Sequence, residues 1–310
     1  MSKEKNFVSA VIYVHNAEAR IKEFLKNVIS VLEDNFEHSE IICVNDYSDD
    51  NSVGVIKEVA KNAKNTCVSV LNMSYFHGLE MSMNAGLDLA IGDFVFEFDT
   101  TVMDYNSEEI IKVYKHALSG YDIVSASPDK KQALSSRVFY SVFHRFGSLS
   151  YKMTTESFRV LSRRVINRID NMNKTVMYRK AVYANCGLKT DNIVYNSISS
   201  EKVSDKYERK YRRKLAMDSL ILFTDVGYKF STMMTFLMML MTGFMVCYSL
   251  LVYFMGNPVE GWTTTILFLS VVFFGLFGIL TIIIKYLQLI IEQVFKRKKY
   301  SFESIEKITK

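Results

Sequence analysis

The stretch VSAVIYVHNAEARIKEFLKNVISVLEDNFEHSEIICV, residues 8–44, decides the fold. It opens with an apolar run rich in β-branched residues at 8–14, which predicts a strand buried on both faces. Residues 17–32 then repeat apolar side chains at helical spacing, and 40–44 form a second apolar run. A strand, a helix and another strand in this order predict a parallel βαβ unit.

The same alternation continues further along the chain. Apolar residues at helical spacing predict two more helices, and a short apolar run predicts a strand near each of them. In a doubly wound sheet of this kind, ligands bind beyond the carboxyl ends of the strands. The polar clusters of the chain lie at these ends, which predicts a ligand site there. The helices are expected at 53–63 and 79–90, the strands at 67–71 and 94–98, and the polar clusters are His15–Asn16, Asn45–Asp50 and Asp99–Thr101.

Beyond residue 107 the alternation becomes less regular. An aromatic-rich helix is expected in this part, and one short strand leads directly into a helix. The chain contains only 2 prolines, so no flexible linker is evident. The helices are expected at 108–118, 135–146 and 163–172, and the strands at 122–125 and 157–161.

Residues 230–294 form an apolar region with very few charged side chains. Two segments within it, 230–254 and 262–284, are each long enough to cross a hydrocarbon core of ~30 Å. Two helices buried in a soluble core would have a similar composition, but the lengths of the segments argue against that alternative. The region therefore predicts a hairpin of two transmembrane helices.

Positive charge flanks this region on one side of the predicted membrane. The net charge of +5 is concentrated in KYERKYRRK at 206–214 and KRKK at 296–299, whereas the connector GNPVEG at 256–261 has no Lys or Arg. Two solvated charge runs are the simpler alternative, but the positive-inside rule places both chain ends in the cytoplasm. Segment 206–223 is amphipathic and basic, as is typical of a helix on an anionic membrane surface. We therefore expect a multi-pass protein of the cytoplasmic membrane, with lipid and no nucleic acid as partner.

Cysteine usage and the N-terminus also suggest that the first part of the chain is cytosolic. The 4 cysteines lie far apart and form no CxxC pair, which suits a reducing compartment. The start, MSKEKN, precedes an apolar run too short for a secretory signal. The expected organisation is a cytosolic α/β domain at 1–204, a basic interfacial helix at 205–229, a transmembrane hairpin at 230–289 and a cytosolic basic tail at 290–310.

Two segments have residues suited to chemistry at the expected ligand site. IICVNDYSDDNS, residues 41–52, ends a strand in Asp46, which suits contact with the base or ribose of a nucleotide. A helix N-cap is the alternative interpretation of such a turn. GDFVFEFDTT, residues 92–101, ends a strand in Asp99, a carboxylate suited to binding a divalent cation. We expect Glu97 to point to the opposite face from Asp99 only if this strand is regular.

The order and spacing of these segments resembles the family 2 glycosyltransferases of the GT-A fold. The resemblance is greatest to the polyprenyl-phosphate glycosyltransferases with two C-terminal transmembrane helices, and it covers nearly the whole chain. VNDYSDDNS is similar to V-D-D-G-S-x-D-x-[ST], GDFVFEFDTT to a segment ending in D-x-D, ESFRVLSRRV to G-D-F-R-L-x-x-R-x-V, and the last apolar segment to Y-L-x-x-I-x-x-E. The residues kept are Asp46, Ser48, Asp50, Gly78, Gly86, Asp88, Ala90, Gly92, Asp93, Asp99, Phe158, Arg159, Arg164 or Arg163, Lys206, Tyr207 and Asp218.

The resemblance implies a mixed GT-A sheet and an enzyme that transfers a hexose, with inversion, from a UDP- or GDP-linked donor to a polyprenyl phosphate. Cell-envelope glycan synthesis or modification is the process it implies. The acceptor phosphate is already an anion, so it needs positioning by cations more than a general base. For each arginine proposed for this role, the alternative interpretation is a surface salt bridge. Packing against other protomers is one interpretation of the Met- and Gly-containing apolar helices, and contact with lipid is the other.

The resemblance also implies roles for particular residues. Catalysis is assigned to Asp99, Arg159 and Arg164, and Mg²⁺ or Mn²⁺ binding to Asp99. Donor binding is assigned to Asn16, Glu18, Asp46, Ser48, Gly78, Asp99 and Thr101. Acceptor binding is assigned to Arg137, Arg159, Arg163, Lys206 and Tyr207, with Arg179 as a further cationic residue.

The chain departs from the family pattern at several polar positions. Thr101, Ser157 and Ser200 stand where carboxylates or an arginine are expected, and Phe76 stands where Asn is frequent. Two interpretations follow: an active transferase with an altered donor site, or a non-catalytic relative that acts as a binding or scaffold subunit. A membrane adaptor without a sugar ligand is a third.

Overall fold

The computed structural model describes residues 3–129, 140–141, 155–171, 178–198, 226–256, 261–294 and 302–309. The chain divides into two compact units. One comprises Met1–Ala216 together with Arg297–Lys310, and the other comprises Met217–Lys296.

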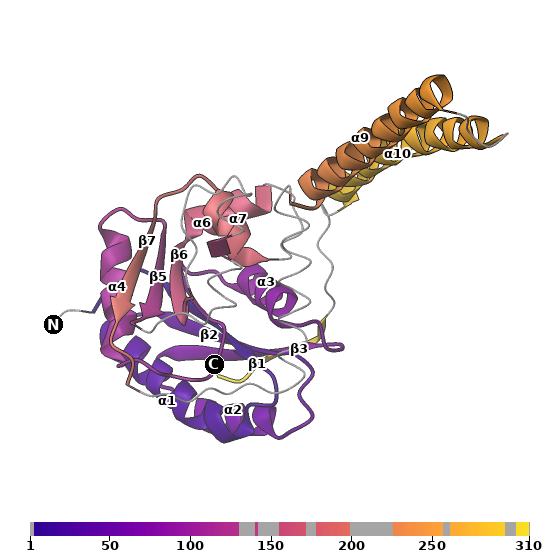
Figure 1. Ribbon diagram of the computed structural model, residues 1–310. Coiled ribbons are helices and arrows are strands. Elements are labelled where there is room, and N and C mark those ends of the chain that lie inside the picture. Colours follow the sequence, from indigo (N-terminus) through magenta and orange to yellow (C-terminus); the bar gives the residue numbers. More distant parts are fainter. Residues whose placement is uncertain are drawn as a thin grey trace. The chain divides into compact units, whose positions relative to one another are not determined.

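In the described part of the first unit, an 8-stranded mixed sheet has the order β7-β5-β6-β4-β1-β2-β3-β8 (Figure 1). The strands β4, β1, β2 and β3 are parallel, β6 runs antiparallel to both β4 and β5, and β8 runs antiparallel to β3. The strands are β1 (Val8–Val14), β2 (Ser39–Asn45), β3 (Thr66–Met73), β4 (Phe94–Phe98), β5 (Ile123–Pro128), β6 (Phe158–Ser162), β7 (Thr190–Tyr195) and β8 (Phe302–Lys307).

Helices cover both faces of the sheet, as expected for strands that are apolar on both sides. One core contains the buried residues of α1 (Glu18–Asn35), α2 (Ser52–Ala60) and α4 (Glu108–Leu118). The opposite core contains those of α3 (Leu79–Leu89), α6 (Arg163–Asn171) and α7 (Arg179–Asn185).

Gly86 explains why α3 can approach the sheet so closely. A Cβ atom at this position would lie 2.4 Å from Cγ1 of Val11 and 2.7 Å from Cγ2 of Val44. These distances are far inside van der Waals contact, so only glycine allows the helix to pack directly on β1 and β2.

Most of the predicted elements occur in the structure. The strands predicted at 8–14 and 94–98 and the helix at 108–118 have the predicted bounds, and the other predicted elements of the α/β domain that lie in the described residues differ by a few residues at their ends. The sequence analysis missed α7 and β7, because α7 has only 7 residues and β7 carries polar residues in its first half. The predicted helices at 135–146 and 206–223 lie outside the described residues, apart from the helical Tyr140 and Ser141.

The predicted tail at 290–310 contains a strand instead. β8 pairs with β3 through the register Leu71↔Ile305, and the backbone N–H of Val68 donates to Oγ1 of Thr309 at 2.7 Å. The side chain of Glu306 forms an ion pair with Lys57. Without β8, the edge of β3 would expose unpaired backbone groups, which explains why this short charged segment is ordered as a strand.

The second unit consists of two long helices in its described residues, α9 (Val226–Met255) and α10 (Trp262–Val294). Residues Lys229–Met255 and Trp262–Leu287 are long and apolar enough to cross a membrane. The helices pack on each other, with the rings of Tyr248 and Trp262 at 6.2 Å and Cε of Met239 3.5 Å from the position of a Cβ on Gly278. Most of their large apolar side chains are exposed, as expected of helices that face lipid.

Candidate active site

The turns that follow β1 and β2 bind each other through hydrogen bonds. Asn16 has a left-handed backbone (φ 46°), its N–H donates to Oγ of Ser48 at 3.1 Å, and its Oδ1 accepts the N–H of Asp49 at 2.9 Å. The N–H of Glu18 donates to Oδ2 of Asp50 at 2.9 Å. These predicted donor-site residues therefore build one joined pair of turns at the carboxyl end of the sheet.

Asp46 lies beneath this surface and is fully buried. Its Oδ1 accepts the backbone N–H of His77 at 2.8 Å, and its Oδ2 accepts the N–H of Gly78 at 2.8 Å and the hydroxyl of Tyr13 at 2.9 Å. Gly78 has φ 83°, a conformation that favours glycine just before α3. Asp46 thus holds the turn at the start of α3. The alternative interpretation, in which the turn that contains Asp46 caps the helix after it, does not describe this role.

Aromatic side chains occupy the surface around Asp46. Tyr47, Tyr75 and Phe76 are exposed by 52%, 58% and 44%, and the rings of Phe76 and His15 lie 4.9 Å apart. Tyr47 has φ 55°, which is uncommon for a residue with a bulky side chain. Backbone strain of this kind is concentrated at functional sites.

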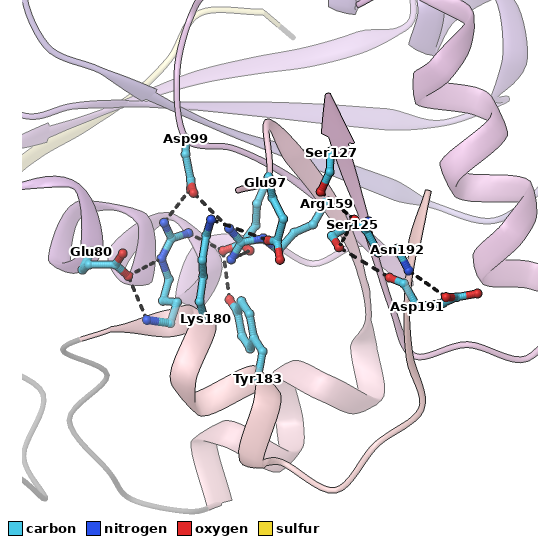
Figure 2. Close-up of polar contacts among 12 residues, drawn as sticks. Glu80, Glu97, Asp99, Ser125, Ser127, Arg159, Lys180, Tyr183, Asp191 and Asn192 are labelled. Atoms are coloured by element: carbon cyan, nitrogen blue, oxygen red, sulfur yellow. Dashed lines mark hydrogen bonds and ion pairs between the residues drawn. The ribbon is translucent and has the colours of Figure 1, made fainter. Parts of the chain in front are cut away.

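Asp99 and Glu97 lie on the same face of β4, together with Arg159 of β6 (Figure 2). Our expectation that Glu97 faces away from Asp99 is wrong, because residues two apart in a strand point to the same side. Glu97 is the cross-strand partner of Arg159, and its Oε2 lies 3.2 Å from Nη1 of that arginine. Oδ2 of Asp99 accepts Nη2 of Arg159 at 3.0 Å.

Arg179, at the start of α7, completes the centre of this cluster. Its Nη2 donates to Oδ1 of Asp99 at 2.6 Å, its Nη1 to Oε1 of Glu97 at 2.5 Å, and its Nε to Oε2 of Glu80 at 2.9 Å. The hydroxyl of Tyr183 also donates to Glu97, at 2.9 Å. The guanidinium group is buried and surrounded by carboxylates, which is the geometry that stabilises a buried cation.

Glu156 and Lys180 extend the charge cluster. Oε2 of Glu156 lies 3.2 Å from Nε of Arg159 and 3.9 Å from Nζ of Lys180. Burial opposes protonation of Lys180, but neighbouring Tyr140 and Glu156 outweigh it and raise the pKa of the lysine. Burial likewise opposes ionisation of Asp99, but the guanidinium groups nearby hold the pKa of this carboxyl well below its usual range.

The residues at the end of β4 do not fit a divalent cation held by Asp99. The two carboxylates at this end of the strand, Asp99 and Glu97, are already paired with the guanidinium groups of Arg159 and Arg179. Oγ1 of Thr100 accepts the N–H of Val102 at 3.2 Å, and Thr101 is buried. Mg²⁺ and Mn²⁺ prefer several hard oxygen ligands, and the described residues contain no group of His, Cys, Asp and Glu suited to a metal ion.

Ser157, which stands where the family pattern has Asp, belongs to a separate network. Its hydroxyl hydrogen-bonds to the hydroxyl of Tyr195, which donates to Oδ1 of Asp104 at 2.7 Å. Oδ2 of Asp104 accepts the hydroxyl of Ser197 at 3.1 Å. Asp104 therefore links the loop after β4 to the end of β7.

The structure separates Arg163 and Arg164 from Arg159. Because β6 is antiparallel to β4, Arg163 lies at the opposite end of β4 from Asp99, ~13 Å along the strand from Arg159. Arg163 donates to the carbonyl of Gly92 at 2.6 Å, and Arg164 is 71% exposed and 3.7 Å from Asp122. One phosphate group cannot contact both Arg159 and Arg164 in this arrangement. The predicted acceptor residues Arg137, Lys206 and Tyr207 lie outside the described residues.

The sequence analysis missed the parts that Glu80 and Lys180 have in the charge cluster. One signal was available, because Glu97 interrupts the apolar strand FVFEF and a carboxylate in a buried strand requires a cation. Nothing in the spacing shows which arginine or lysine provides it, since α7 lies far from β4 in the chain.

Comparisons with known proteins agree with this architecture. The family model for glycosyl transferase family 2 matches residues 9–187. The uncharacterized glycosyltransferase YkcC of Bacillus subtilis (strain 168) is 24% identical over 94% of this chain and 92% of its own length. The SfII prophage-derived bactoprenol glucosyl transferase of Shigella flexneri is 26% identical over 94% of this chain and 96% of its own.

Among solved structures, mannosyl-3-phosphoglycerate synthase from Rubrobacter xylanophilus matches with a TM-score of 0.49 and 14% identity, over 70% of this chain and 73% of that one.

The family match spans the sheet from β1 to α7 and thus includes Asp46, Asp99, Arg159 and Arg179. The chain belongs to glycosyl transferase family 2 and is a glycosyltransferase with a GT-A-like mixed α/β sheet.

Proposed function

We propose that this glycosyltransferase moves a hexose, with inversion, from a UDP- or GDP-linked donor to a polyprenyl phosphate in the cytoplasmic membrane. The observation that carries the proposal is the extent of the match to the bactoprenol glucosyl transferase of Shigella flexneri. A match over 94% of the chain extends beyond the α/β domain and through the two apolar helices. The likeness therefore concerns the part of the chain suited to a lipid acceptor as well as the part suited to a sugar donor.

The arrangement of β8 supports a two-pass topology. β8 follows α10 in the chain and pairs with β3 of the α/β domain, and the elements that precede α9 belong to the same unit. This connectivity supports a hairpin that crosses the membrane twice and has both its ends on one side. The basic segments 206–214 and 296–299 favour the cytoplasmic side.

The turns at the carboxyl ends of β1 and β2 support donor binding at this edge of the sheet. Exposed rings at Tyr47, Tyr75 and Phe76 offer planar surfaces on which a nucleobase can stack. Asp46 would act through the turn that it holds, since its carboxylate is buried.

The acceptor phosphate needs no proton removed, so the protein has to bind it, orient it toward the anomeric carbon and exclude water. Transfer breaks the bond between that carbon and the departing diphosphate and forms one to a phosphate oxygen of the lipid. Positive charge near Asp99 would stabilise the departing group.

A binding or scaffold subunit without catalysis is the second candidate function. One observation favours it: both oxygens of Asp99 are bound to arginines, and Thr101 replaces the second carboxylate.

To test this proposal, membranes that contain the protein are incubated with a panel of radiolabelled UDP- and GDP-hexoses, and the lipid is then extracted. Label in the lipid phase, absent from membranes without the protein, supports the transferase. Absence of label with every donor contradicts it and favours the scaffold.

A further inference from the structure

The charge cluster at the end of β4 contains its own cations. A nucleoside diphosphate carries several negative charges, and an enzyme that binds or releases one must place positive charge beside it. In this chain the groups beside Asp99 are the guanidinium groups of Arg159 and Arg179, at 3.0 Å and 2.6 Å. Arginine keeps its proton in proteins, so both groups are permanent cations.

The two arginines are fixed in place by carboxylates on their buried sides. Glu80 and Glu97 bind Arg179, and Glu97 and Glu156 lie beside Arg159. A divalent cation at Asp99 would have to approach both fixed guanidinium groups, which repel it. A phosphate at the same position would be attracted to them.

Asp99 and Lys180 form the more accessible end of the cluster. Their side chains are 17% and 14% exposed, compared with 2% for Arg159, 1% for Arg179 and 0% for Glu97. Figure 2 shows the ammonium group of Lys180 pointing toward the end of the cluster where Asp99 lies. Among the ion pairs of the described residues in this cluster, the one between this ammonium and Glu156 is the longest, at 3.9 Å, so Lys180 is held less tightly by carboxylates than Arg159 or Arg179.

We infer that Lys180, with Arg159 and Arg179 behind it, supplies the positive charge for the diphosphate of the donor, and that this chain binds a nucleoside diphosphate without a divalent cation at Asp99. The inference rests on the proposed function for the identity of the ligand. Lys180 is assigned the direct contact, and Asp99 holds the two guanidinium groups at the edge of the site.

Replacing Asp99 should affect nucleotide binding in the opposite way from replacing a metal ligand. The cluster contains the carboxylates of Glu80, Glu97, Asp99 and Glu156 and the cations of Arg159, Arg179 and Lys180, so carboxylates exceed cations by one. Asp99→Asn makes the numbers equal and keeps an oxygen that accepts a hydrogen bond. Binding of an anion should then be unchanged or tighter, whereas loss of a metal ligand would abolish metal-dependent binding.

The experiment measures the Kd of UDP and of GDP by calorimetry with the full-length protein in detergent, in EDTA and again in Mn²⁺. We expect binding of one of the two nucleotides in EDTA, with a Kd that changes less than about threefold in Mn²⁺. Lys180→Gln should weaken binding about tenfold, the effect of losing one charge-assisted hydrogen bond. Lys189→Gln, at an exposed lysine just before β7, is the matched control and should bind as the unaltered chain does.

Binding that requires Mn²⁺ and disappears in Asp99→Asn overturns the inference, and so does normal binding by Lys180→Gln. Absence of nucleotide binding under both conditions overturns it as well. The lipid-labelling assay on the same preparation separates the two proposals. Mn²⁺-dependent binding with label in lipid contradicts the inference alone, and EDTA-resistant binding without label in lipid contradicts the proposed function alone.

Discussion

Replacement of Arg179 by methionine tests whether the charge cluster stabilises the domain. Arg179 is buried and donates to Asp99, Glu97 and Glu80, so Arg179→Met leaves these carboxylates without their shared cation. Breaking a buried ion pair by removing one partner costs about 3–5 kcal/mol. For a domain of this size that corresponds to a fall of roughly 10 °C in melting temperature.

Buried cysteines make the change measurable in a detergent-solubilised membrane protein. Cys43 is fully buried in β2, and burial raises the pKa of its thiol to about 12, so it should react with a maleimide dye only after the sheet opens. Cys186 is also buried, next to α7. The melting temperature is read from dye fluorescence during heating.

Arg164→Met is the matched control, because this arginine is 71% exposed and its ion pair should contribute less than about 1 kcal/mol. Adding Glu80→Gln to Arg179→Met should recover part of the loss, because it removes the charge of a carboxylate whose described ion pair is with Arg179, whereas Glu97 and Asp99 still lie beside Arg159. A melting temperature of Arg179→Met equal to that of Arg164→Met would refute the reasoning, since the cluster would then contribute nothing that its burial predicts.

Three other perturbations probe the packing, the C-terminal strand and the acid sensitivity of the fold. Gly86→Ala places a methyl group inside contact distance of two valines and should cost about 1–3 kcal/mol in thermal unfolding, whereas Gly275→Ala, with open space around it, should be neutral. Ile308, directly after β8, donates its N–H to Val68, so the alternation of an antiparallel ladder directs the N–H of Glu306 toward Val70. Glu306→Pro removes this donor and should make β8 more susceptible to limited proteolysis, while Glu306→Gln should leave the cleavage pattern unchanged. Because the pKa of Asp99 is lowered in the folded state, its ionised form stabilises the protein above the unfolded pKa of about 4, and this contribution is lost as the pH falls below that value. Melting followed by circular dichroism between neutral and acidic pH should therefore show a steeper loss for the unaltered chain than for Asp99→Asn, and equal slopes would contradict the assignment.

The regular part of the fold could be predicted because its signals are local. The run 8–14 is apolar on both faces, and the apolar spacing of 17–32 matches a helix, so the βαβ unit follows from adjacent residues. The lengths of 230–254 and 262–284 likewise follow from the segments themselves.

Pairing between distant segments could not be predicted in this way. The strand β8 forms because the edge of β3 offers it backbone partners, and FESIEK has too few apolar residues to indicate a strand by itself. The separation of Arg159 from Arg164 depends on the antiparallel direction of β6, which the short segment does not encode locally. Two arginines close together in sequence were therefore assigned to one ligand, although they lie toward opposite ends of β4.

The charge cluster also depends on tertiary structure. Glu97 indicates a buried cation, but the partners come from β6 and α7, and only the packed domain brings them together. The structural role of the buried Asp46 could not be predicted for the same reason, because the turn that covers it comes from the segment before α3.

The most direct test of the central claim is transfer to a defined acceptor. Full-length protein in lipid vesicles is incubated with the labelled nucleotide sugar and either a polyprenyl phosphate or the matching polyprenol, which lacks the phosphate. We predict label in the lipid phase with the phosphate, none with the alcohol, and release of the label from the lipid by mild acid as free sugar. Equal labelling of both lipids, or none of either with any UDP- or GDP-hexose, would contradict the account.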